Sequence, residues 1–203
     1  MTYDFDYLVI GSGFGGSVSA HRLTEKGYTV GVLEAGRRWR AEDFPRTTWR
    51  VRKFLWAPLL RCFGIMRMTF FRDAFVLSGA GVGGGSLVYA NTLLVPPESF
   101  FEDAQWRDIK DWRAALAPHY EVALKMLGAV ESPHLGETDH LLEETAREMG
   151  REATFKRATV GVYFGEGPGR THPDPFFEGR GPERSGCTLC AGCMVGCRFH
   201  AKN

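Results

Sequence analysis

The chain has 203 residues, of which 44% are hydrophobic, and a formal net charge of +1 at pH 7. This composition is ordinary for a globular protein, and so small a net charge supplies no overall field that would attract nucleic acid. No apolar run is long enough to span a bilayer, because the best candidate, residues 54–71, is interrupted by a proline, a glycine and two arginines.

The first predicted elements are a strand, a helix and a second strand within residues 6–36. The apolar run YLVI has no helical period, which indicates a parallel strand buried on both faces. The first residues show no charged region followed by an apolar core and a small-residue cleavage site, so we do not expect a secretory leader. A helical pattern follows and ends at Lys26, and YTVGVLE then indicates a second strand that ends on Glu34. We therefore expect a Rossmann-like α/β fold in a cytoplasmic protein with reduced thiols.

The segment GSGFGG, between the first strand and the helix, has the G-x-G-x-x-G spacing of a dinucleotide-binding turn. Gly11 allows the tight turn, Gly13 lets the backbone approach a pyrophosphate, and Gly16 lets the helix pack closely on the strand. The helix N-terminus directs free N–H groups at the anion. Glu34 can accept hydrogen bonds from a ribose and would repel a 2′-phosphate, which disfavours NADP. The fingerprint alone does not separate FAD from NAD.

Residues 37–72 form a strongly basic segment. They include ten lysines and arginines but only two acidic residues, and the basic residues are interleaved with aromatic and aliphatic ones. One interpretation is an interfacial segment that docks on an anionic membrane. The interpretation that we favour is a loop whose arginines are solvated and whose aromatic residues face the core.

A second glycine-rich stretch, LSGAGVGGGSLVYANTLLVPP, covers residues 77–97. So many glycines would destabilise a regular helix or strand, but they suit a backbone that lies against a flat ligand. Its composition also fits a structural turn. Further along, apolar periodicity predicts a helix over residues 111–129, with Asp111 as N-cap and a break at Pro118, and a second helix from about residue 138 to 149. Residues 161–186 are rich in glycine and proline and predict loop.

The last segment contains four cysteines with the spacing C-x2-C-x2-C-x3-C, namely Cys187, Cys190, Cys193 and Cys197. This is the bacterial ferredoxin spacing and predicts a candidate [4Fe-4S] site. Two features oppose it: Arg198 stands where the ferredoxin run has proline, and one such run needs a further cysteine to complete a cluster. Zinc fits less well, since its structural sites usually separate two ligand pairs. The remaining alternative is a packing role for small apolar thiols.

Together these motifs resemble the bacterial glucose–methanol–choline (GMC) oxidoreductases, and within them the cholesterol-oxidase-like flavoproteins. The resemblance rests on GSGFGG with LEAG, GVGGGSLVYAN, PDPFF and GPERSGCTLCAGCMVGCRFHAKN, in the expected order over nearly the whole chain. It implies that residues 1–203 are the N-terminal part of an FAD-binding domain. Its parts are the strand–helix–strand unit at 6–36, the flavin-side glycine loop at 77–97, a helical and loop insertion at 98–185, and the cysteine-rich segment at 186–203.

The resemblance also assigns site residues. Those expected beside the flavin are Gly83, Gly84, Gly85, Ser86 and Asn91, while Tyr89 stands where several relatives have asparagine. The resemblance favours the packing role for the cysteines, since FAD is the usual redox cofactor of the family. No residue here matches the family's catalytic His, Glu or Asn motifs, so no catalytic residue is named and we expect those residues beyond Asn203.

The resemblance implies an FAD-dependent oxidoreductase that oxidises a small lipophilic alcohol, for example a 3-hydroxysteroid such as cholesterol, by hydride transfer to flavin N5. A lipophilic substrate would also favour peripheral contact with a membrane. Two alternatives stay open: a flavin and iron–sulfur electron-transfer subunit, and a non-enzymatic nucleotide-sensing module.

The sequence further predicts an incomplete fold that lacks most of the substrate domain. Only two strands of the dinucleotide type are visible, with residues 75–77 as a candidate for part of a third. A parallel sheet this small buries too little apolar surface to offset chain entropy. We therefore expect residues 1–203 alone to be largely insoluble or molten, to lose FAD, and to oxidise no alcohol.

Overall fold

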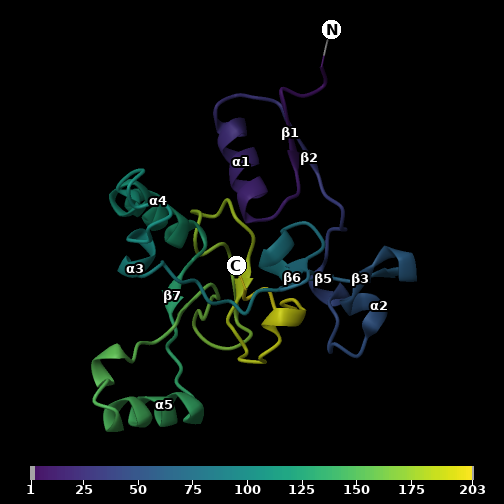
Figure 1. Ribbon diagram of the computed structural model, residues 1–203. Coiled ribbons are helices and arrows are strands. Elements are labelled where there is room, and N and C mark those ends of the chain that lie inside the picture. The colour runs from purple at the N-terminus through teal and green to yellow at the C-terminus, as the bar shows by residue number, and fades with distance from the viewer. Residues whose placement is uncertain (1–2, 203) are drawn as a thin grey trace. The chain divides into compact units, whose positions relative to one another are not determined.

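The computed structural model describes residues 3–202, which form two units (Figure 1). The first unit comprises the residues up to Ala90, together with Gly165–Arg170 and Ser185–Lys202. The second comprises Asn91–Phe164 and Thr171–Arg184 and falls largely within the predicted insertion. In the described part of the chain, no helix combines the length and the apolar character that a membrane crossing needs.

The first unit begins with the strand–helix–strand arrangement that the sequence predicts. Strand β1 (Tyr7–Ile10) is followed by helix α1 (Phe14–Glu25) and strand β2 (Val30–Leu33). The two strands pair in parallel, since the helical crossover returns the chain to the same end of the sheet. Helix α1 lies beside the strand pair (Figure 1). This is the expected Rossmann-like α/β unit.

The expectation that β1 is buried on both faces is wrong for this chain. Leu8 is 61% exposed and Ile10 is 87% exposed. Burial of a parallel strand depends on cover over both faces of its sheet, and this sheet has only two strands among the described residues. Its apolar composition therefore marks a surface that the described residues leave uncovered.

The rest of the first unit consists of short elements. They are η1 (Ala41–Asp43), α2 (Val51–Phe54), β3 (Trp56–Ala57), η2 (Pro58–Leu60), β4 (Cys62–Phe63), β5 (Met66–Phe70), β6 (Phe75–Gly79), η3 (Gly84–Leu87) and η5 (Cys193–Val195), with β10 (Arg184–Ser185) at the boundary between the units. Strands β3 and β4 pair antiparallel, as do β5 and β6. Residues 75–77 therefore belong to an antiparallel hairpin and are not part of a third dinucleotide-type strand, for which they were a candidate.

The core of the first unit uses part of the basic segment. Ile65 and Met66 are almost completely buried, and they pack with Phe44 and Val88. Other apolar residues of the same segment are not in the core, since Leu59 at the tip of the β3–β4 hairpin is fully exposed. The favoured interpretation, in which the aromatic and aliphatic residues face inward, therefore holds only for part of this segment.

The second unit contains the two predicted helices. Its elements are α3 (Glu98–Phe101), α4 (Trp112–Met126), β7 (Val130–Glu131), α5 (Glu137–Glu148), η4 (Glu152–Thr154), β8 (Thr159–Val160) and β9 (Thr171–His172). The Asp111 carboxylate accepts from Ala114 N–H at 2.9 Å, as an N-cap does. Helix α4 continues through Pro118, so the predicted break is absent. The proline loses its N–H and crowds the carbonyl one turn before it, but the hydrogen bonds of the turns on either side hold the helix together.

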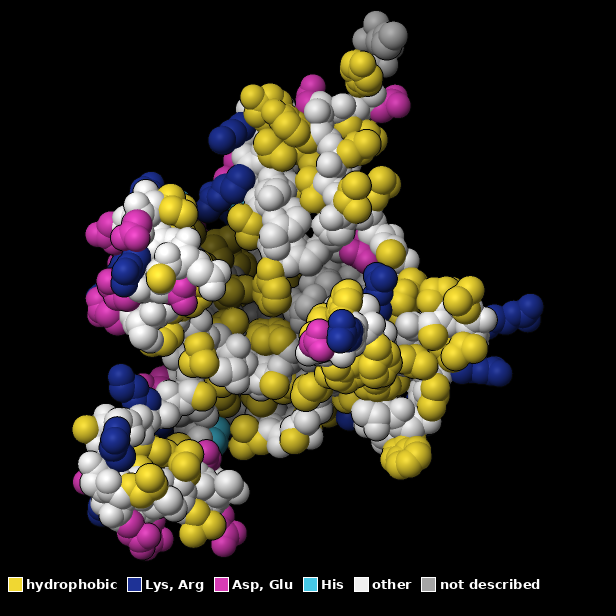
Figure 2. All heavy atoms as spheres, viewed as in Figure 1, with side chains coloured by type: hydrophobic (Ala, Val, Ile, Leu, Met, Phe, Trp, Pro, Cys, Tyr) yellow, Lys and Arg dark blue, Asp and Glu magenta, His cyan; other side chains and the backbone are white. Residues whose placement is uncertain are grey.

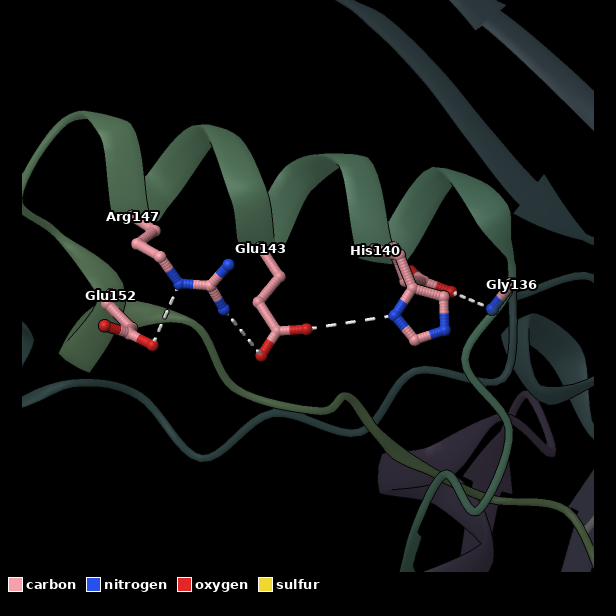
Figure 3. Close-up of polar contacts among 6 residues, drawn as sticks. Gly136, His140, Glu143, Arg147 and Glu152 are labelled. Atoms are coloured by element: carbon pink, nitrogen blue, oxygen red, sulfur yellow. Dashed lines mark hydrogen bonds and ion pairs between the residues drawn. The ribbon is translucent and has the colours of Figure 1, made fainter.

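Helix α5 carries a row of exposed ion pairs, which Figure 3 shows along one side of the helix. His140 Nδ1 lies 3.8 Å from Glu143, and Arg147 Nε lies 3.3 Å from Glu152. Surface pairs of this kind contribute little to stability. His140 is therefore a surface residue of this helix.

Candidate cofactor site

The turn after β1 has the geometry that its three glycines predict. Gly11 has φ +90°, a backbone conformation that favours glycine. A Cβ on Gly16 would overlap with the carbonyl oxygen of Gly11, so only glycine lets α1 approach the turn this closely. By contrast, a Cβ on Gly13 would meet only the Cα of Gly84, at 4.0 Å. Protein packing therefore does not require glycine at position 13, and the space beside it suits a ligand.

The N-terminus of α1 is prepared for an anion. Gly13 is the N-cap, has extended backbone and provides no side-chain hydrogen bond to the first turn. The first N–H groups of a helix have no partner within the helix, and together with the helix dipole they attract a negative group. A pyrophosphate at Gly13 would meet these requirements.

Glu34 lies at the end of β2 and is bonded to the turn. Its Oε2 accepts from the N–H and the hydroxyl of Ser12, at 3.0 and 2.8 Å, and its Oε1 accepts from Gly36 N–H at 2.9 Å. Burial raises the pKa of Glu34, but these hydrogen bonds outweigh it, so the pKa lies below its usual value and the group is ionised at neutral pH. A backbone hydrogen bond from Ala35 lowers the pKa as well, so a bound ribose hydroxyl would share one of the carboxylate's roughly four acceptor sites.

Ser12 joins the two glycine-rich stretches. Its side chain is buried, and its hydroxyl accepts from Gly83 N–H at 3.1 Å while it donates to Glu34. The backbones also come close at this point, since a Cβ on Gly84 would lie 2.8 Å from the Cα of Gly13. The structure thus brings together the fingerprint and the second glycine loop. The sequence had given Ser12 no role, although its place between two glycines of the fingerprint could have drawn attention to it.

The second loop has the backbone that its glycines predict. Gly83 and Gly84 have φ +108° and +56°, and the hydroxyl of Ser86 donates to Gly83 O at 3.0 Å. Within this loop Gly85 lies near the ring of Phe14, the first residue of α1. Asn91 belongs to the second unit, where its carbonyl accepts from Gly161 N–H at 2.7 Å. This backbone bond does not test the predicted contact of Asn91 with the flavin, which stays a prediction.

The cysteine-rich segment does not have the form of a metal site. All five cysteines are free, and residues 3–202 contain no group of three or more His, Cys, Asp or Glu side chains placed to hold a metal ion. Burial raises the pKa of the Cys187 thiol. Two sulfurs accept hydrogen bonds from nearby backbone N–H groups, Cys187 from Leu189 and Cys197 from Lys202. The predicted [4Fe-4S] site at Cys187, Cys190, Cys193 and Cys197 is therefore unsupported. A packing role suits the three partly buried cysteines, whereas Cys190 is exposed.

Burial also lowers the pKa of Lys202, to about 8, because a desolvated ammonium is less stable than a hydrated one. This lysine lies within the cysteine-rich segment, and the residue is only 8% exposed. The sequence had given it no role beyond its place in the closing AKN.

Comparison with known proteins gives matches along the whole chain. Residues 9–51 match the family described as NAD(P)-binding Rossmann-like domain. The cholesterol oxidase of Mycobacterium tuberculosis is 58% identical over 207 residues, which cover 100% of this chain and 36% of that protein. The cholesterol oxidase of Acinetobacter baumannii is 50% identical, over 99% of this chain and 37% of that protein. An uncharacterised GMC-type oxidoreductase of Mycobacterium tuberculosis is 30% identical, over 97% of this chain and 28% of that protein. The chain thus spans about a third of the length of these curated relatives.

Proposed function

We propose that this chain is the FAD-binding part of an enzyme that oxidises a steroid alcohol. The chain is similar along its whole length to two cholesterol oxidases. The observation that carries the proposal is the meeting of the two glycine loops, where Gly13 and Gly84 approach backbone to backbone and Ser12 bonds Gly83. Glycine at positions 13 and 84 leaves no side chain to cover the backbone beside this contact, which suits the close approach of an anionic dinucleotide.

The residues proposed to hold FAD come from both loops and from β2. Gly13 and the first turn of α1 would hold the pyrophosphate, and Glu34 would accept from a ribose hydroxyl. Gly83–Ser86 would lie beside the flavin ring. When bound, the flavin would supply the hydride acceptor, at its N5 position, for the oxidation of the alcohol carbon.

FAD is favoured over NAD for two reasons. The family model that names NAD(P) covers residues 9–51, a segment that does not distinguish the two dinucleotides. The relatives of this chain are named oxidases, and chemistry with oxygen is carried by cofactors such as flavins and not by nicotinamide alone. With FAD bound, the second glycine loop would lie against the flavin ring.

The substrate is proposed by analogy with these relatives, whose name states cholesterol. A lipophilic 3-hydroxysteroid is the class that we propose here. The groups that would accept the hydroxyl proton are expected outside residues 1–203, and no residue of this chain is proposed as catalytic.

We also propose peripheral contact with an anionic membrane through the basic segment. Leu59 and Leu60, at the tip of the β3–β4 hairpin, are 100% and 71% exposed, and Arg52 and Lys53 on α2 are exposed nearby in the chain. Figure 2 shows hydrophobic side chains gathered with Lys and Arg over the region of α2 and β3. Apolar tips flanked by cations suit the boundary between lipid headgroups and acyl chains. A cytoplasmic location stays a prediction.

The test of the proposed function uses the natural full-length protein that contains this sequence. It should be purified with bound flavin, seen as two visible absorption bands, and should oxidise 3-hydroxysteroids much faster than short primary alcohols. The absence of flavin would contradict the cofactor, whereas flavin with no steroid oxidation would contradict only the substrate. The prediction that residues 1–203 alone lose FAD is checked by gel filtration of that fragment.

A further inference from the structure

Lys202 uses its whole donor capacity within the first unit. Its Nζ donates to the carbonyl oxygens of Leu87 at 2.9 Å, Tyr89 at 3.2 Å and Cys193 at 2.9 Å. An ammonium group has three N–H donors, and here each has a main-chain acceptor. A buried charge is tolerated only where such bonds replace its hydration.

These three bonds join distant parts of the chain. Leu87 ends η3, the short helix that contains Gly84 and Gly85 of the flavin-side loop, and Tyr89 follows two residues later. Cys193 begins η5 in the cysteine-rich segment. Hydrogen bonds to a charged donor are stronger than those between neutral groups, so one side chain fixes both segments.

The connection continues to the anion-binding turn. Lys202 Nζ lies 4.8 Å from the centre of the Tyr89 ring, in a cation–π contact. The Tyr89 ring meets the ring of Phe14 edge-on, with 5.8 Å between centres. Phe14 is the first residue of α1 and follows Gly13 directly. Lys202, Tyr89 and Phe14 thus connect the cysteine-rich segment to the turn that would hold a pyrophosphate.

We propose that Lys202 is a positioning residue of the cofactor site, which holds the exit of the flavin-side loop against the first turn of α1. The cysteine-rich segment is the support that carries this lysine: Cys193 supplies a carbonyl acceptor, and Cys197 Sγ accepts from Lys202 N–H at 3.4 Å. Cys193 and Cys197 then have a structural purpose that needs no metal. This inference rests on the proposed function, since the site that Lys202 positions is the proposed FAD site.

The deciding variant is Lys202→Met in the natural full-length protein, since methionine keeps an unbranched apolar stem but has no donor and no charge. The control is Lys125→Met, at an exposed position on α4. We expect amide hydrogen exchange of residues 84–89 in FAD-free Lys202→Met to be at least about tenfold faster than in the wild type. The Kd for FAD, from quenching of flavin fluorescence, should rise at least about tenfold, which corresponds to about 1.4 kcal/mol. Lys125→Met should change neither quantity.

Lys202→Arg tests whether the bonds carry the effect. It keeps the charge and the donors, but its planar guanidinium fits three converging carbonyls less well than an ammonium does. We therefore expect it to recover part of the FAD affinity. A merely structural lysine would lower the unfolding temperature in Lys202→Met and leave both the exchange of residues 84–89 and the Kd within twofold of wild type, and that result would overturn the proposal.

The wild-type protein provides a second test that does not depend on a folded variant. If Lys202 links the segments, addition of FAD should slow exchange in residues 193–201 as well as in residues 84–89. Slowing confined to residues 84–89 would refute the link. If the wild type binds no FAD at all, the proposed function fails, whereas the exchange comparison between FAD-free wild type and Lys202→Met still decides whether Lys202 holds the loop.

Discussion

Ser12→Ala is the sharpest test of the candidate cofactor site. The substitution removes the hydroxyl that donates to Glu34 at 2.8 Å and accepts from Gly83 N–H at 3.1 Å, and it changes almost nothing else in volume. A hydrogen bond to a charged group contributes about 1.5–3 kcal/mol, and a buried N–H without an acceptor costs about 1–3 kcal/mol. Water can replace part of this at the partly exposed Glu34, so we expect a loss of about 2 kcal/mol in the joining of the two loops.

If this loss appears in cofactor binding, the Kd for FAD of the natural full-length protein should rise about thirtyfold. The assay is titration of the FAD-free protein with FAD, followed by the quenching of flavin fluorescence. Ser19→Ala is the matched control, because Ser19 is an exposed serine on α1 and loses the same atom. A Kd for Ser12→Ala within twofold of the value for Ser19→Ala would refute the reasoning that Ser12 joins the loops for ligand binding.

Four further predictions follow from the same structure. Because the pKa of Glu34 lies below 4.5, its contribution to stability is complete above that pH and is lost as pH falls through the lowered pKa; Glu34→Gln should therefore flatten the acid side of a plot of unfolding temperature against pH. In the full-length protein, Gly16→Val should prevent folding and give insoluble protein, because its side chain would overlap with Gly11 O. Gly13→Ala should fold normally by circular dichroism but bind FAD at least about tenfold more weakly, because its Cβ would occupy only the space proposed for the ligand. The full-length protein purified without oxygen should contain no stoichiometric iron or sulfide, and Cys190→Ser should leave its flavin content unchanged. Iron that is present in the wild type and lost in Cys190→Ser would instead support the iron–sulfur interpretation. Wild-type protein should bind anionic vesicles, and this binding should weaken with added salt and in Leu60→Asp. Equal binding of the wild type to neutral vesicles would contradict the electrostatic part of the membrane proposal.

The cofactor-binding turn is the part of the fold that could be predicted from the sequence alone. The positive φ of Gly11 and the contact between Gly16 and Gly11 O involve residues five positions apart, so the spacing of the glycines fixes them. The helix that Asp111 caps was predictable for the same reason, since its cap bond spans three residues. Local geometry follows from local sequence wherever the interacting groups are neighbours in the chain.

Features that depend on distant contacts required the tertiary structure. The burial of β1 was predicted wrongly from its apolar residues, because a strand's exposure depends on what covers its sheet and not on its own composition. The cysteine spacing left a cluster and a packing role open, because the convergence of four sulfurs is decided by the path of the loop between them. Ser12 meets Gly83 across 71 positions and Lys202 meets Leu87 across 115, and no local pattern encodes such pairs. The sequence by itself determined a dinucleotide-type turn, and only the packing of the chain decided which residues join that turn to the second glycine loop.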